Sequence, residues 1–266
     1  MQVALGRQAT KAGYRLVAFD RIGSTNAEAL TRVRAGERGR CWFVTTEQTA
    51  GRGRRQRAWI APRGNLACSV LEILDVTPAT AATLGFAAGL ALESALRQVS
   101  LEAALRGGEL AFTLKWPNDV LANGRKLSGI LLEAEQGAGG LAVVIGAGTN
   151  IVDAPTGTPT PATSLKALGI EVSAEDLFTA LSDAWAEYIG IWDGGRGFGA
   201  IRKAWLVRAA GLGQPVAITT GDAIIEGTFD TIDEQGCMVV RTMEGRMVPI
   251  TAGDVYFGSA ATARAV

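Results

Sequence analysis

Short apolar runs, several alternating with polar residues, are spread along residues 14–151 and are typical of strands. Glycine, proline, asparagine and aspartate collect between the runs, where they favour turns. Asn123-Gly124 separates two of the runs and is a strong signal for a two-residue hairpin turn. The pattern predicts strands at 14–19, 41–46, 66–73, 110–116, 120–122, 126–134 and 141–151.

Four segments carry helical signals instead. Thr25 and Glu28 have the spacing of a capping box and predict a short helix up to about Arg34. Pro78 suits the first turn of a long helix, rich in alanine and leucine, that is predicted over 78–99. Further helices are predicted after a Pro/Thr-rich loop at 153–163, at 173–192 and 198–209.

The character of the chain changes after Gly211-Leu212-Gly213. Short strands with glycine, aspartate and glutamate turns follow at close spacing, which is typical of a small all-β unit. They are predicted at 215–220, 223–232, 236–242 and 247–250. We therefore predict an α+β fold: a mixed, mostly antiparallel sheet packed with helices at residues 1–211, and a small C-terminal all-β barrel at 212–266.

The overall charge of the chain argues against a dedicated nucleic-acid binder. Its 266 residues contain 26 Lys+Arg and 26 Asp+Glu, whereas such proteins usually carry a basic excess. Histidine is absent, which removes Ser-His-Asp and Cys-His catalysis and any metal site that needs imidazole. The chemistry must therefore come from other side chains.

Cysteine usage and hydropathy predict a cytoplasmic protein with no membrane partner. Cys41, Cys68 and Cys237 form no C-x-x-C pair and lie in apolar runs, as buried reduced thiols do. The chain has no stretch of about 20 uncharged apolar residues, the length that a membrane helix needs. Its first residues lack the apolar region of a secretory signal.

The densest chemical signal is residues 51–59, Gly-Arg-Gly-Arg-Arg-Gln-Arg-Ala-Trp. Arginine forks match carboxylate and phosphate oxygens, and glycine lets a backbone approach a ligand closely. We expect a mobile loop, spanning about residues 50–64, that closes over an anion. Taken alone, the segment is also compatible with gripping nucleic acid.

Three later segments are ordinary when taken separately. Residues 115–119, Lys-Trp-Pro-Asn-Asp, end a predicted strand, and Pro-Asn-Asp is also common turn chemistry. Residues 126–130 begin the next strand with a lysine that suits a solvated edge. Residues 146–150, Gly-Ala-Gly-Thr-Asn, place small residues in a strand, where they mark a bulge or admit a ligand. A P-loop is excluded, because the chain has no Gly-Lys dipeptide.

The order of these segments resembles the biotin protein ligase family. The resemblance covers about residues 14–151 and continues more loosely through Trp205 and Pro215 into the C-terminal unit. It implies an ATP- and Mg²⁺-dependent enzyme that forms biotinyl-5'-AMP and then biotinylates a lysine of a biotin carboxyl carrier domain of a carboxylase. The motifs that carry the resemblance are Ser24-Thr25-Asn26, Gln48 and the segments 51–59, 115–119, 126–129 and 146–150.

The resemblance also implies roles for individual residues, and these roles fall into four groups. The catalytic residues are Arg52, Arg54 and Lys126. The biotin-binding residues are Ser24, Thr25, Asn26, Gln48, Arg52, Gly53, Arg54, Lys126 and Gly129. The ATP- or adenylate-binding residues are Arg54, Arg57, Lys115, Asn118, Asn150 and Trp205, and Asp119 is the candidate metal ligand.

Two alternative functions remain at this point. Lipoate or octanoate transferases look like structural cousins, but an aliphatic acid would leave the polar group of residues 24–26 and Gln48 unpaired. Nucleic acid is disfavoured, because residues 212–266 carry three arginines against seven acidic residues. Only about 13 residues precede the first predicted strand, so we expect no DNA-binding domain of the kind that some relatives carry. A homodimer is possible.

Overall fold

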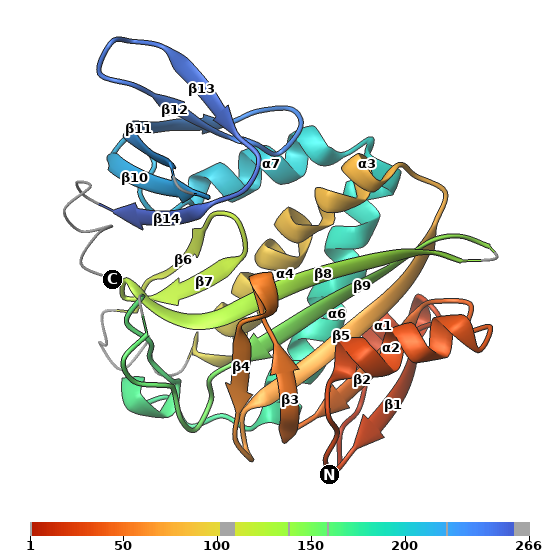
Figure 1. Cartoon of the computed structure of the whole chain (residues 1–266). Helices are drawn as coiled ribbons and strands as arrows, with labels where there is room; N and C mark the ends of the chain where they lie inside the picture. Colours follow the sequence, from red (N-terminus) through yellow and green to blue (C-terminus); the bar gives the residue numbers. More distant parts are fainter. Residues whose placement is uncertain (1, 102–109, 138, 159, 222, 258–266) are drawn as a thin grey trace.

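A seven-stranded sheet is the centre of the computed structural model, which describes residues 2–101, 110–137, 139–158, 160–221 and 223–257. Its strand order is β1-β2-β5-β9-β8-β7-β6 (Figure 1). The strands are β1 (Arg15–Phe19), β2 (Cys41–Thr45), β5 (Leu66–Leu74), β6 (Phe112–Lys115), β7 (Asp119–Ala122), β8 (Arg125–Gly137) and β9 (Gly140–Thr149). A two-stranded hairpin, β3 (Gln48–Arg52) and β4 (Ala58–Ala61), stands apart from it.

All neighbours in this sheet are antiparallel except β1 and β2. A parallel pair needs a crossover, and the helix α2 (Thr25–Arg34) provides it. The other α-helices are α1 (Arg7–Lys11), α3 (Pro78–Ala82), α4 (Leu84–Val99), α6 (Ala174–Trp192) and α7 (Phe198–Val207), and the 3₁₀ turns are η1 (Arg54–Gln56), η2 (Lys166–Leu168) and η3 (Asp193–Gly195). The prediction of a mixed, mostly antiparallel α+β fold is confirmed.

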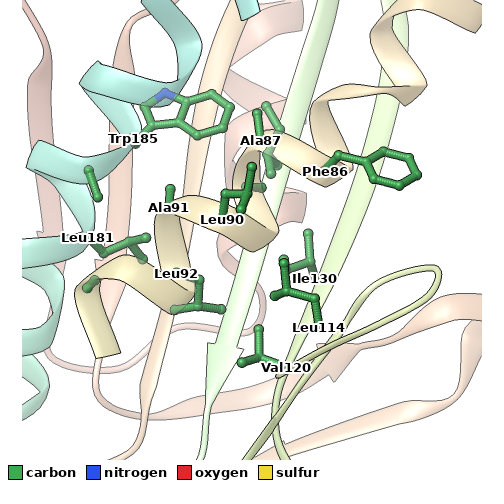
Figure 2. Packing of buried hydrophobic residues seen from close by; sticks show 14 of the residues in the cluster. Phe86, Ala87, Leu90, Ala91, Leu92, Leu114, Val120, Ile130, Leu181 and Trp185 are labelled. Carbon is green, nitrogen blue, oxygen red and sulfur yellow. The ribbon is translucent and has the colours of Figure 1, made fainter. Parts of the chain in front are cut away.

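The hydrophobic core lies between one face of the sheet and the two helices α4 and α6, which also pack against each other (Figures 1 and 2). Leu90 and Leu92 of α4 are fully buried. Around α4, Figure 2 shows side chains of the sheet, such as Leu114 and Ile130, and Trp185 of α6. The opposite face of the sheet is covered only in part, by α2, and this leaves room for a site.

The helix predicted over 78–99 is divided at Thr83 into α3 and α4. The Thr83 hydroxyl donates to the carbonyl of Thr80 and accepts from Trp192 Nε1 at 2.8 Å. These two hydrogen bonds stabilise the break between α3 and α4. Pro78–Val99 is long and apolar enough by composition to cross a membrane, but 72% of its most apolar window is buried in this fold. The high hydropathy of this segment therefore reflects its burial in the protein core.

The C-terminal unit is an open five-stranded antiparallel sheet of order β13-β12-β11-β10-β14, and not the closed barrel that we predicted. Among the described residues the edge strands β13 and β14 do not pair with each other. The sequence pattern missed β14, a four-residue strand that pairs with β10 from a distance along the chain. The strands are β10 (Pro215–Thr220), β11 (Ala223–Ile232), β12 (Met238–Arg241), β13 (Met247–Ile250) and β14 (Asp254–Phe257).

One carboxylate lies in the core beside α6. Glu72 of β5 is 4% exposed, and its Oε1 accepts from the Tyr14 hydroxyl at 2.5 Å and from Trp185 Nε1 at 3.0 Å. Burial is the largest influence on this group and raises the pKa of Glu72 above its ordinary value, against the two donors, which lower it. Burial also raises the pKa of Tyr14, so its hydroxyl stays a donor.

We predict that Glu72→Gln changes the pH dependence of stability. A raised folded pKa means that the native state holds the proton more tightly than the unfolded chain. The wild-type protein therefore loses stability, relative to the variant, as the pH rises from the ordinary glutamate pKa through the raised one. Denaturant unfolding of both proteins at about pH 4, 6 and 8 measures this difference. Parallel stability profiles would contradict the prediction.

Candidate active site

A cavity of about 270 Å³ opens on the sheet face that carries α2, between the β3–β4 hairpin and the start of β14. Of the residues singled out from the sequence, all except Trp205 line it. They are Ser24, Thr25, Asn26, Gln48, Arg52, Gly53, Arg54, Arg57, Lys115, Asn118, Asp119, Lys126, Gly129 and Asn150. Residues far apart in the sequence therefore meet at one place.

One end of the cavity is uncharged and polar, and is formed by the first turn of α2. Ser24 caps this helix, its hydroxyl accepting from the amide of Ala27 at 3.3 Å. Thr25 and Asn26 follow and are 3% and 5% exposed. Gln48, at the start of β3, accepts from the amide of Thr25 at 2.9 Å. This end presents hydroxyl and amide groups held in fixed positions, as suits a small polar ring.

The floor of the cavity is a row of glycines on β8 and β9. A Cβ on Gly146 would lie 2.2 Å from Asn26 Oδ1, and one on Gly148 would lie 2.3 Å from Trp59 Nε1. Gly129, which pairs with Gly148, would meet the same indole at 3.1 Å. Glycine is required here because α2 and the Trp59 ring approach the sheet more closely than any side chain permits.

The arginine segment is the β3–β4 hairpin and its turn, rather than an irregular loop. Arg55 and Gln56 turn it in the left-handed region, at φ of 54° and 60°. Arg52 Nη2 donates to Glu133 Oε2 of β8 at 3.2 Å, and Arg54 Nη1 donates to Asn118 Oδ1 at the same distance. The hairpin is thus fastened to the sheet by its arginines.

The hairpin also reaches the C-terminal sheet. Both Arg55 and Arg57 pair with Asp254 of β14, at 3.0 Å and 2.6 Å. Arg54 Nη1 lies 3.5 Å from the carbonyl oxygen of Gly253. Sequence reasoning missed Asp254 and Glu133, because an acidic residue in a strand carries no local sign that an arginine hairpin folds against it.

The other end of the cavity is basic. Its lining contains five basic residues, Arg52, Arg54, Arg57, Lys115 and Lys126, against two acidic ones, Asp119 and Asp254. Burial lowers the pKa of Lys115 and of Arg54, as expected where the charged form loses water. Such desolvated cations gain when an anion arrives, so this end suits phosphate or carboxylate oxygens.

Lys126 and Asn150 show what a ligand would meet there. Lys126 Nζ lies 2.7 Å from Asp119 Oδ1 and 5.6 Å from the ring centre of Trp59. Asn150 is 1% exposed, donates to the carbonyl of Thr163 at 3.2 Å and has no hydrogen-bond partner for Oδ1 in the described part of the chain. A buried acceptor without a partner is costly, and a ligand N–H or O–H would satisfy it.

One predicted site residue, Trp205, is not brought into the site. Trp205 lies in the core at 2% exposure, with its ring centre 5.3 Å from that of Phe86, and does not line the cavity. Within the ranges described above, no three His, Cys, Asp or Glu residues cluster as metal ligands; the candidate ligand Asp119 does line the cavity and pairs with Lys126.

The chain matches two protein-family models and is similar to curated ligases. Residues 18–150 match the Biotin/lipoate A/B protein ligase family, and residues 211–258 match the Biotin protein ligase C terminal domain. The chain is 41% identical to the biotin–[acetyl-CoA-carboxylase] ligase of Paracoccus denitrificans, over 90% of this chain and 98% of that protein. The Mycobacterium tuberculosis protein of that name is 35% identical, with 88% and 85% coverage.

A solved structure has the same fold. The biotin protein ligase of Aquifex aeolicus in complex with biotin and ATP superposes with a TM-score of 0.74 at 23% identity, covering 92% of this chain and 98% of that chain. At this identity the likeness supports the fold alone.

We predict that Gly148→Ala displaces Trp59 and destabilises the protein by about 1–3 kcal/mol, the usual cost of overpacking. Denaturant unfolding measures the loss. The matched control is Gly85→Ala, where the added Cβ would meet Leu132 Cδ1 at an ordinary 3.7 Å. Because Gly85 lies in α4, this control should be neutral or stabilising. Equal stability of the two variants would contradict the role given to Gly148.

We predict that Asp254→Asn loosens the hairpin without unfolding the protein. Each exposed ion pair contributes about 0.2–1 kcal/mol, so two lost pairs raise the open population several-fold. Limited trypsin digestion, read by mass spectrometry, should show faster cleavage after residues 52–57. Asp230→Asn, which breaks a surface pair with Arg241 in the same C-terminal sheet, is the control. Equal cleavage in both variants would rule out the tether.

Proposed function

This chain belongs to the biotin/lipoate A/B protein ligase family, and we propose that it is an ATP-dependent biotin protein ligase. In this proposal the enzyme forms biotinyl-5'-AMP and passes the biotinyl group to a lysine of a biotin carboxyl carrier domain. One observation supports it above others: a polar end and a basic end share a single cavity lined by all the predicted ligand residues except Trp205.

The polar end would bind the ureido ring of biotin. A cyclic urea has two N–H donors and one carbonyl acceptor, and Ser24, Thr25, Asn26 and Gln48 supply fixed hydroxyl and amide partners. An aliphatic acid such as lipoate or octanoate would leave these buried groups unpaired, which costs affinity. Gly129 and Gly53 would let the valeryl chain pass close to the backbone.

The basic end would carry out the first step. A biotin carboxylate oxygen attacks the α-phosphorus of ATP, and the bond to pyrophosphate breaks. Arg52, Arg54 and Lys126 would offset the repulsion between carboxylate and triphosphate and stabilise the charge that develops in the transition state. Arg57, Lys115, Asn118 and Asn150 would hold the nucleotide, the last through its unpartnered Oδ1.

Mg²⁺ would enter with ATP. A single carboxylate, Asp119, does not form a metal cage, but Mg²⁺ is commonly held by one or two carboxylates together with substrate phosphates. Asp119 is therefore the proposed protein ligand of an ion that the triphosphate brings. When bound, the ion would neutralise charge on the phosphates.

The second step is attack by a lysine amine of the carrier domain on the activated carbonyl. The C–N bond forms as the C–O bond to AMP breaks, and the amine loses a proton. The mixed anhydride hydrolyses if water reaches it, so the β3–β4 hairpin would close over it. Ile60 of β4 lines the cavity and is 62% exposed, as befits a hairpin at the entrance.

The proposal also covers the location, the domain organisation and the partners of the enzyme. The enzyme would act in the cytoplasm, consistent with three free cysteines. We propose two units, residues 1–211 and 212–266. Residues 258–266 of the second unit lie outside the described part of the chain. A possible homodimer and the absence of a nucleic-acid partner stay predictions.

We predict biotin-dependent exchange of labelled pyrophosphate into ATP, and no exchange with lipoate or octanoate. This assay reports the first step alone and needs no carrier protein. Exchange with lipoate or octanoate only would move the enzyme to the neighbouring branch of the family. Absence of exchange with every acid, in folded protein supplied with Mg²⁺, would refute adenylation.

We predict that Lys126→Met lowers the rate of this exchange about 10²–10³-fold, the range for removal of one charge-stabilising donor. Methionine keeps most of the length of the side chain but removes its charge and its N–H donors. Lys166→Met, at an exposed position in η2, is the control and should retain the wild-type rate. A similar rate in both variants would exclude Lys126 from the first step.

A further inference from the structure

Glu133 of β8 lies where the polar end of the cavity meets the arginine hairpin. It follows Gly129 and Leu131 on the same face of the strand, because alternate residues point to one side. Its Oε2 accepts from Asn26 Nδ2 at 2.8 Å and from Arg52 Nη2 at 3.2 Å. One carboxylate oxygen therefore joins a ring-binding residue to a residue of the hairpin.

The carboxylate determines how the Asn26 amide is oriented. An ionised carboxylate only accepts, so the NH₂ of Asn26 must face it, and Oδ1 must face the other way. There Oδ1 lies 2.6 Å from the hydroxyl of Ser69, which is 0% exposed. The carbonyl of Leu131, at 3.3 Å from Nδ2, supports the same orientation with a longer contact.

The orientation of the Asn26 amide also sets the direction of the hydrogen bond between the hydroxyl groups of Ser69 and Thr25. Ser69 Oγ is also 2.7 Å from Thr25 Oγ1, but a hydroxyl has one proton to give. Because Asn26 Oδ1 can only accept, the Ser69 proton goes to it, and Thr25 must complete the second contact with its own proton. The alternative acceptor for Thr25, Gln48 Oε1, is farther away at 3.3 Å. Thr25 is left with lone pairs for the cavity.

We propose that Glu133 is a positioning residue for the reaction, an inference that rests on the proposed function. Its carboxylate fixes the direction of the Asn26–Ser69–Thr25 chain, so that Thr25 presents an acceptor to a urea N–H. The same oxygen holds Arg52 beside the ligand. Recognition of the ring and the position of the hairpin are thereby coupled through one side chain.

The test is biotin binding by calorimetry, together with the KM values for biotin and ATP in pyrophosphate exchange. Glu133→Gln should weaken biotin binding roughly tenfold, as loss of a charge-assisted hydrogen bond does, and raise the KM for biotin more than the KM for ATP. It should also speed hydrolysis of the adenylate when no carrier is present, because Arg52 is released.

Glu135→Gln is the matched control, two residues along the same strand face, where the carboxylate pairs with Arg34 at the surface. Thermal unfolding verifies that both variants fold. A role for Glu133 in stability alone would lower the melting temperature and leave the two KM values in their wild-type ratio. That result, or a biotin affinity equal to that of Glu135→Gln, would overturn the inference.

A second variant tests the direction of the chain. Asn26→Asp sets two carboxylates against each other and should abolish biotin binding. Adding Glu133→Gln supplies an amide donor to the new carboxylate, which still accepts from Ser69, so binding should recover in part. No recovery would refute the assigned direction. Absence of biotin-dependent exchange in the wild-type enzyme would instead refute the proposed function.

Discussion

The close approach of side chains to a bare stretch of the central sheet is the constraint on which the site depends. Gly129, Gly146 and Gly148 remove the Cβ atoms that would normally cover β8 and β9. Asn26 and Trp59 take that space and lie directly on the backbone. The glycines cost strand stability, and packing of α4 against the opposite face offsets this cost.

The basic end of the cavity is assembled from elements that contribute little charge individually. Arginines of the hairpin, Lys115 from β6 and Lys126 from β8 converge there, although the whole chain is neutral. Four of these cations pair with carboxylates of other elements: Lys126 with Asp119, Arg52 with Glu133, and Arg55 and Arg57 with Asp254. The cations are therefore partly compensated without a ligand, and an arriving anion has to compete with these pairs.

Because of this competition, we expect the hairpin to open and close. Ion pairs between partly exposed side chains contribute little, so the hairpin opens at small cost. The apolar contact of Trp59 with the glycine row holds its end more firmly. A closure built from weak ion pairs and one partly buried ring would suit an enzyme that must exclude water for one step and admit a carrier lysine for the next.

The C-terminal sheet takes part in this arrangement through residues at the start of one strand. Gly253 and Asp254 contact the hairpin, and Trp116 donates to the carbonyl of Gly236 at 3.2 Å. The sheet is open rather than closed, and its edge strand β14 is the one that faces the cavity. Asp254 of this sheet pairs with Arg55 and Arg57 of the hairpin.

The sequence by itself determined most of the elements, because strands, caps and turns depend on local signals. Apolar alternation, caps and turn residues define most of the strands and α2, whereas the resemblance in the order of the motifs singled out the residues that line the cavity. Only the tertiary structure decided which carboxylates meet the arginines, that Trp205 is buried away from the cavity, and that the C-terminal strands form an open sheet. These outcomes depend on pairings between residues far apart in the chain, which leave no periodic or compositional trace at either partner.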